Sequence, residues 1–247
     1  MILKTVPFGP YTLHVDPDGY FGTLFLQNSL NYEWHVHGEL ERLIPGCQGF
    51  LDLGANIGLH VLGVKVIDSM VPVYAFEPSP RNVHVLCQNI HYNKLNKVAV
   101  FPVAAAAIQG VIWLNGDWEN SQPSRMESPN YPTIWPAFPV GRFVASGAAD
   151  VFKVDVEGFE FEAWQGMTHL FSHKPRPKMV FEMSFPCLKN TGIDPVEELR
   201  WLEQFGYEFI VLENKPGMRK GPLKAQAVVD HILGFGEQVA DILAEAP

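Results

Sequence analysis

The run from Phe50 to His60, FLDLGANIGLH, constrains the fold of this 247-residue chain more than any other segment. A short apolar stretch holds Asp52 near its end, Gly54 and Gly58 follow, and a second apolar stretch begins at Leu59. A buried strand, a glycine-containing turn and a helix in this order are typical of a nucleotide-binding α/β domain. The segment therefore predicts an α/β fold with a ligand site at the turn.

Composition favours a folded protein and limits the kinds of partner that it can bind. Hydrophobic residues make up 47% of the chain, and 27 acidic against 18 basic residues give a net charge of −9, which argues against nucleic acid as a partner. The three widely spaced cysteines are typical of a reducing compartment, no apolar run approaches the ~20 residues of a membrane span, and the N-terminus lacks a signal-peptide pattern. We expect a cytoplasmic protein without a membrane partner.

Apolar stretches alternate with stretches of helical periodicity along most of the chain. Beyond the opening strand, we expect strands over 71–77, 98–107, 151–155, 178–182 and 208–212, and helices over 33–44, 80–93, 160–170 and 195–205. This alternation predicts a doubly wound, mostly parallel sheet with right-handed crossovers.

The two ends of the chain extend this pattern. Short alternating stretches in residues 1–30 predict a small β extension, and residues 231–244 predict a final strand followed by a helix. No composition shift marks a boundary. We therefore expect one domain over 1–247, with residues 1–45 as an N-terminal extension.

Residues 110–150 lack clear periodicity. The part from 115 to 139 is rich in Pro, Ser, Asn, Gly and Trp. A structureless segment of this length inside a domain is usually a functional loop or an insertion, and both alternatives stay open. If the segment is a lid, its aromatic side chains would contact an apolar ligand: Trp118, Tyr131, Trp135 and Phe138.

Four of the predicted strands end in an acidic residue: Asp52, Glu77, Asp155 and Glu182. The carboxyl ends of parallel strands meet at one edge of a doubly wound sheet, where ligands bind. Grouped carboxylates repel one another, so four at equivalent positions indicate a function. We expect these side chains to converge on one site.

The glycine turn differs from the dinucleotide-binding GxGxxG motif. Asn56 takes the place of the middle glycine, the third glycine is absent, and no GxxxxGK[ST] phosphate loop occurs in the chain. Glu77 lies 77 − 52 = 25 residues beyond Asp52, where a carboxylate can accept hydrogen bonds from both hydroxyls of a ribose. The alternative is that Glu77 only caps the helix after Pro78. The pattern favours a ligand with a ribose and no phosphate.

Three motifs resemble the FkbM-type S-adenosylmethionine-dependent methyltransferases: FLDLGANIG at 50–58, AFEPSP at 75–80 and KVDVEGFE at 153–160. The resemblance implies the class I methyltransferase (Rossmann-like) fold, with a seven-stranded sheet whose last strand is antiparallel. It also implies S-adenosylmethionine as cofactor and a small-molecule substrate, methylated on a hydroxyl of a sugar or secondary metabolite.

The resemblance also assigns cofactor-binding residues. Glu77 would hold the ribose, Pro78 and Ser79 would lie toward the adenine, and Glu33, in a Tyr-Glu pair ahead of the first strand, would lie on the pocket floor. The methionine end of the cofactor would be lined by the opening turn: Asp52, Gly54, Ala55, Asn56 and Gly58. The Leu-Asp pair usual ahead of the DVEG strand is missing between 110 and 150.

Asp155 and Glu157 of the DVEG motif are the candidate catalytic residues. A hydroxyl has a pKa far above neutral, so a base or a metal must assist its deprotonation. One of two neighbouring carboxylates has a raised pKa, which suits a general base. Alternatively, Asp155, Glu157 and Glu182 could hold a divalent cation, since clustered oxygens are its usual ligands. We favour the base.

Two other functions share parts of this pattern. An NAD(P)-dependent oxidoreductase has a similar turn, although the missing third glycine and the DVEG motif are against it. A catalytically inactive module could keep the cofactor-binding fold. We interpret His60, which opens the helix after the turn, as a helix residue near a polar pocket.

Overall fold

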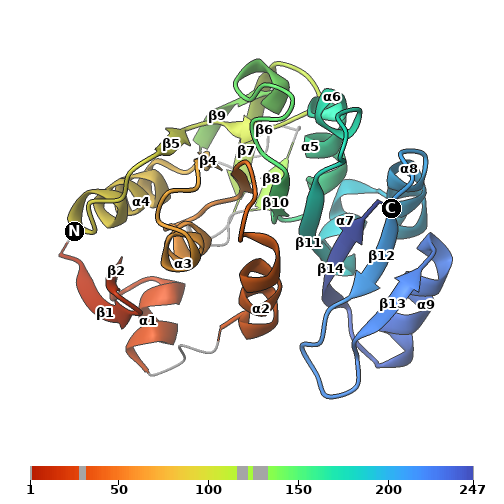
Figure 1. The fold of residues 1–247 in the computed structure, drawn as a ribbon, viewed down its shortest axis with the longest axis horizontal. Helices are drawn as coiled ribbons and strands as arrows, with labels where there is room; N and C mark the ends of the chain where they lie inside the picture. The colour runs from red at the N-terminus through yellow and green to blue at the C-terminus, as the bar shows by residue number, and fades with distance from the viewer. Residues whose placement is uncertain (1, 28–31, 116–121, 125–132, 247) are drawn as a thin grey trace.

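The computed structural model describes residues 2–27, 32–115, 122–124 and 133–246. They form a central sheet, a small second sheet and an N-terminal hairpin, with helices packed around them (Figure 1). The central sheet contains β3 (Phe50–Leu53), β4 (Val73–Phe76), β5 (Val98–Phe101), β10 (Val151–Val154), β11 (Lys178–Ser184), β12 (Glu208–Val211), β13 (Lys220–Leu223) and β14 (Val239–Glu245).

The strand order of the central sheet is β13-β12-β14-β11-β10-β3-β4-β5. The five strands from β11 to β5 run parallel, and β14 lies antiparallel between β11 and β12. Together with β12, these strands make the seven-stranded sheet of the predicted class I arrangement, which is confirmed. The sequence does not predict β13, an eighth strand that pairs antiparallel with β12 at the edge.

Helices cover both faces of this sheet. Phe50 packs in a cluster with α2, α3 and α4, whereas its neighbour Leu51 packs in a cluster with α5, α6, α8 and α9, because successive side chains of a strand point to opposite faces. The helices on the two faces are α2 (Trp34–Leu43), α3 (Leu59–Ile67), α4 (Pro80–Tyr92), α5 (Glu160–Gly166), α6 (Thr168–Phe171), α8 (Pro195–Glu203) and α9 (Ala225–Gly234). Among the described residues, no helix is long and apolar enough to cross a membrane.

The N-terminal extension is a hairpin of β1 (Lys4–Phe8) and β2 (Tyr11–Val15), as predicted, followed by the helix α1 (Tyr20–Leu26), which the sequence does not predict. Asn93, the C-cap residue of α4, holds the hairpin by accepting a hydrogen bond from the Thr12 amide (2.8 Å) and donating one to the Thr12 carbonyl (2.7 Å). The extension thereby becomes a wall beside the glycine turn.

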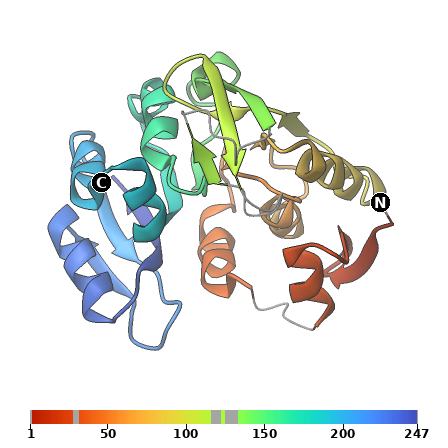
Figure 2. The same cartoon turned by 180° about the vertical axis from the view of Figure 1, so that it is seen from behind.

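The described parts of residues 110–150 form strands, so the expectation of a structureless segment was wrong for them. They contribute β7 (Gly110–Asn115), β8 (Gln122–Ser124) and β9 (Thr133–Phe138) to a second sheet of order β6-β9-β7-β8, where β6 (Ala104–Ala105) is the end of the predicted 98–107 strand (Figure 2). Trp118 and Tyr131 lie outside the described residues. Trp135 and Phe138 pack within the protein, so they are not the ligand contacts we expected of a lid.

Two further differences concern the C-terminal part. A short helix, α7 (Phe185–Thr191), follows β11 directly and is not predicted. In the final segment the helix α9 precedes the strand β14, which reverses the predicted order. The reversal allows β14 to insert between β11 and β12, because the helix carries the chain back across the sheet.

The glycines of the opening turn are required by packing within the protein. Gly54 has φ +85°, and a Cβ there would lie 1.8 Å from the carbonyl oxygen of Asp155. Gly58 has φ +93°, and its Cβ would lie 2.6 Å from Cδ1 of Leu86 on α4. The two glycines therefore bring the ends of β3 and β10 together and seat α4 against the turn.

Replacing Gly54 by alanine should lower the free energy of unfolding by roughly 3 kcal/mol or more. Two costs add: alanine is strained in a left-handed backbone, and its Cβ would collide with the carbonyl oxygen of Asp155. Gly206 is a matched control, since it has the same φ of +85° and nothing within 4 Å of a Cβ. Gly206→Ala should cost only about 1 kcal/mol. Urea unfolding measures both free energies, and equal losses would contradict the packing explanation.

Candidate active site

A pocket with an empty volume of about 1040 Å³, including its open mouth, lies at the carboxyl ends of β3, β4, β10 and β11. Three of the predicted strand-end acids, Glu77, Asp155 and Glu182, line it together, as expected. The other predicted residues that line it are Glu33, Gly54, Ala55, Asn56, Pro78 and Glu157. Asp52, Gly58 and Ser79 lie behind this lining.

Asp52 is fully buried beneath the pocket. It pairs in register with Lys153 of β10, and both of its carboxylate oxygens lack a hydrogen-bond partner among the described residues. Burial raises the pKa of Asp52 to about 6, against the lowering effect of the nearby cations His60 and Lys153. A buried polar group without a partner is costly, and Asp52 bears this cost directly beneath the pocket.

Glu77 holds the turn and the next helix together. Its Oε2 accepts a hydrogen bond from the Asn56 amide (2.9 Å), and its Oε1 accepts from the Ser79 amide (2.8 Å) and from Nδ2 of Asn82 (3.2 Å). Burial raises the pKa of Glu77 to about 7. The N-cap of α4 is Ser79, whose side chain accepts from the Asn82 amide, so Glu77 is not simply the helix cap.

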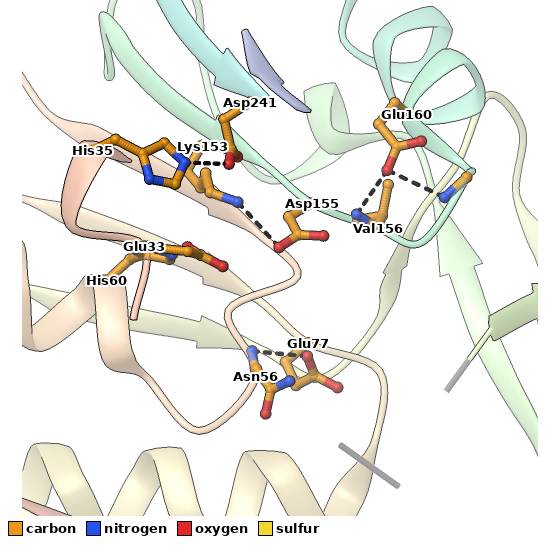
Figure 3. A network of polar contacts seen from close by, with 11 residues as sticks. Glu33, His35, Asn56, His60, Glu77, Lys153, Asp155, Val156, Glu160 and Asp241 are labelled. Atoms are coloured by element: carbon orange, nitrogen blue, oxygen red, sulfur yellow. Dashed lines mark hydrogen bonds and ion pairs between the residues drawn. The ribbon is translucent and has the colours of Figure 1, made fainter. Parts of the chain in front are cut away.

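Lys153 is the central cation of the site, a role that the sequence does not reveal although the residue stands in the KVDVEGFE motif. Its side chain is completely buried, and Nζ lies 3.0 Å from Oδ2 of Asp155 (Figure 3). Burial alone would lower the pKa of Lys153, but the carboxylates Asp155, Glu33, Asp241 and Glu182 raise it well above its usual range. Lys153 therefore stays charged among acids from four parts of the chain.

His60 and Glu33 form a second ion pair in the pocket wall, with 2.7 Å between Nε2 and Oε2 (Figure 3). Burial opposes both charges, but Lys153 and His60 lower the pKa of Glu33, and Glu33 raises the pKa of His60. His60 is a helix residue beside a polar pocket, as we interpreted it, but the sequence does not predict its ion pair with Glu33. Its position directly after the turn was the available signal.

Backbone strain also gathers at this pocket. Among the described non-glycine residues, positive φ occurs at three pocket-lining positions, Glu33 (+50°), Asn56 (+50°) and Glu157 (+56°), and at two positions outside the pocket lining, Lys94 and Lys97. Such backbone costs about 1–3 kcal/mol per residue and is found preferentially at functional sites. The fold holds these three polar side chains in place against a local cost.

Glu157 and Glu182 line the pocket on the side opposite the turn, and both have raised pKa values. Burial, followed by the charge of Asp155, raises the pKa of Glu157 to about 7 and that of Glu182 to about 10. Within the described ranges, no three His, Cys, Asp or Glu side chains are arranged to hold a metal ion. This does not support the alternative of a metal held by Asp155, Glu157 and Glu182.

The family model of the methyltransferase FkbM domain matches residues 52–209. The chain belongs to the FkbM methyltransferase family. It is therefore an S-adenosylmethionine-dependent methyltransferase, which overturns the NAD(P)-dependent alternative. A comparison with curated proteins finds no match.

Several solved structures are similar to this chain at low sequence identity. A protein from Clostridium thermocellum, provisionally assigned as an rRNA methylase, is 7% identical over 86% of this chain and 93% of its own, with a TM-score of 0.50. An rRNA methylase from Streptococcus thermophilus is 8% identical, over 85% and 93%, with a TM-score of 0.49. The precorrin-6y C5,15-methyltransferase of Geobacter metallireducens GS-15 is 13% identical, over 80% and 78%, with a TM-score of 0.45.

Glu182→Gln should gain stability relative to the wild type as pH rises. The pKa of Glu182 is about 10 in the folded chain and ~4.3 in an unfolded one. Between these values the unfolded chain has released a proton that the folded chain retains, so the stability of the wild type falls. Urea unfolding between about pH 5 and about pH 9 should show a widening gap in favour of the variant.

The control for this prediction is Glu41→Gln, which removes an exposed carboxylate on α2. Its free energy of unfolding should keep a constant offset from that of the wild type over the same range. A constant offset for Glu182→Gln as well would show that the Glu182 carboxyl titrates normally in the folded chain.

Proposed function

We propose that this chain transfers a methyl group from S-adenosylmethionine to a hydroxyl of a small molecule, such as a sugar or a secondary metabolite. The observation that carries the proposal is that Asp155 and Glu157 line the same pocket as the Gly54–Asn56 turn and Glu77. Cofactor-binding groups and proton acceptors therefore share one cavity. Both are needed for O-methylation, since the attacking oxygen must lose its proton.

The residues of the turn side fit the cofactor. Glu77 presents a buried carboxylate for the ribose hydroxyls, and Asn56 and Pro78 line the pocket beside it. The Asp52 carboxylate lies beneath the turn and outside the pocket lining, so it would attract the charged amino group of the methionine end through space and not by direct contact. When bound, S-adenosylmethionine supplies a methyl group made electrophilic by its sulfonium.

Glu157 is the base in this proposal. With a pKa of about 7 it is available in its ionised form near neutral pH and retains affinity for a proton. Asp155, held at its Oδ2 by the ammonium of Lys153, offers its other oxygen to orient the hydroxyl. The proton would pass from the hydroxyl to Glu157 as the oxygen attacks.

The charge of the pocket limits the acceptor. Among the described residues, no Lys or Arg lines the pocket, and the lining imidazole of His60 is paired with Glu33. Glu77, Asp155 and Glu157 are further lining acids, whereas Glu182, with a pKa of about 10, is neutral near pH 7. Phe21, Ile112 and Phe159 add apolar surface. Carboxylates in a partly buried cavity repel phosphate and carboxylate groups. We therefore propose an acceptor without an anionic group near the reacting hydroxyl, and the same repulsion opposes a nucleic acid substrate.

Glu77→Ala should weaken cofactor binding by ~1.5–3 kcal/mol, the usual contribution of a hydrogen bond to a charged group. Titration calorimetry with S-adenosylhomocysteine measures the change, and Glu77→Gln, which keeps one acceptor oxygen for the turn, separates ribose binding from loss of the turn. An unchanged dissociation constant in both variants would remove Glu77 from the ribose role.

Glu157→Gln should lower turnover ~100-fold or more while the affinity for S-adenosylhomocysteine stays within about threefold, because a base acts only in the chemical step. Asp155→Asn should likewise lower turnover and leave the affinity for S-adenosylhomocysteine nearly unchanged. Mass spectrometry of a panel of neutral, cationic and phosphorylated hydroxyl compounds incubated with S-adenosylmethionine measures the transfer. Tight cofactor binding with no methylated product from any compound would instead favour the inactive module.

A further inference from the structure

The DVEG segment forms a tight turn directly after β10. Glu157 and Gly158 both have left-handed backbones, with φ +56° and +92°, and the Phe159 amide donates to the Val156 carbonyl at 3.3 Å. Two successive residues with positive φ bridged in this way make a turn that suits glycine or asparagine far better than glutamate. Glu157 therefore occupies an unfavourable position, and something must hold it there.

The side chain of Glu160 spans this turn. Its Oε1 accepts a hydrogen bond from the Val156 amide at 3.0 Å and from the Gly158 amide at 3.2 Å, one on each side of Glu157 (Figure 3). No other acceptor contacts these two amides within the described residues. Because Glu160 is the first residue of α5, its carboxylate also lies at the positive end of that helix.

Burial makes these contacts strong. Glu160 is only 3% exposed, and a hydrogen bond to a charged acceptor gains strength away from water. Glu198 of α8 is buried nearby, and its own burial, followed by the charge of Glu160, raises its pKa well above its usual range. Burial also raises the pKa of Glu160, to about 7, which is less than the rise at Glu198, so Glu160 is the one of the two carboxyls that ionises first.

We propose that Glu160 is a positioning residue that fixes the DVEG turn and thereby points the carboxylate of Glu157 into the pocket. Glu160 does not line the pocket itself, so it acts through the turn that it holds, whose residues Val156 and Glu157 do line the pocket. The inference rests on the role of Glu157 proposed above. It explains why the strained backbone at Glu157 persists.

Amide hydrogen exchange of the wild type and of Glu160→Ala tests this directly, with no acceptor present. Exchange at Val156 and Gly158 should accelerate ~10-fold or more, while the amides of β3 and β4 keep their protection, because only the turn opens. In Glu160→Gln the amide oxygen can still accept but carries no charge, so exchange at both sites should accelerate less than in Glu160→Ala. Unchanged exchange in Glu160→Ala would overturn the proposal.

Two further variants keep the test decisive if Glu160→Ala does not fold. Glu160→Asp retains the charge but is one methylene shorter, so it should also release the two amides. Glu198→Gln replaces one neutral group by another and should leave them protected. Equal acceleration throughout β3, β4 and the turn in Glu160→Asp would show a general structural role and overturn the proposal.

Methyl transfer then separates this inference from the proposed function. Glu160→Ala should lower kcat by about the same factor as Glu157→Gln, with little change in the affinity for S-adenosylhomocysteine, and the double variant should be no worse, because both act through one group. Full kcat in a variant with a released turn would overturn the positioning role. Failure of the wild type to methylate any acceptor contradicts the proposed function and leaves the exchange result valid.

Discussion

The ion pair between Lys153 and Asp155 is the interaction on which the rest of the site depends. The face of the sheet covered by α2 and α3 carries charged side chains near the strand ends: Asp52 on β3, Lys153 on β10, Glu182 on β11 and Asp241 on β14. Buried carboxylates at this spacing repel one another, and one enclosed ammonium among them offsets that repulsion. Because Lys153 offsets this repulsion, the site can hold several acids, some to bind the cofactor and one to act as a base.

How far the site could be predicted depends on whether a signal is local. The glycine turn, the strand-end acids and Glu77 are readable because a strand, a turn and a helix are set by neighbouring residues. Lys153 and the pair of His60 with Glu33 are not, since they depend on the register of β3 against β10 and on where the extension returns to the sheet. The small sheet is hidden because its strands are short and interrupted by prolines.

Gly54 and Glu160 each have a structural role that the sequence does not predict. Gly54 is glycine because the carbonyl of Asp155 occupies the space a side chain would need, so the turn and the DVEG strand are fixed against each other before any ligand arrives. Glu160 holds the following turn from behind. The two walls of the pocket are thus joined at their bases, which pre-organises the distance between cofactor and base.

The ion pair of Glu33 with His60 shows that the pocket needs residues that lie ahead of the matched family domain. Glu33, Tyr32 and Phe21 line the pocket, yet all three precede residue 52, where the match to the family domain begins. A chain shortened to the matched domain would keep the turn and the DVEG strand but leave the imidazole of His60 facing solvent. The smallest polypeptide that encloses the whole pocket therefore reaches back at least to α1.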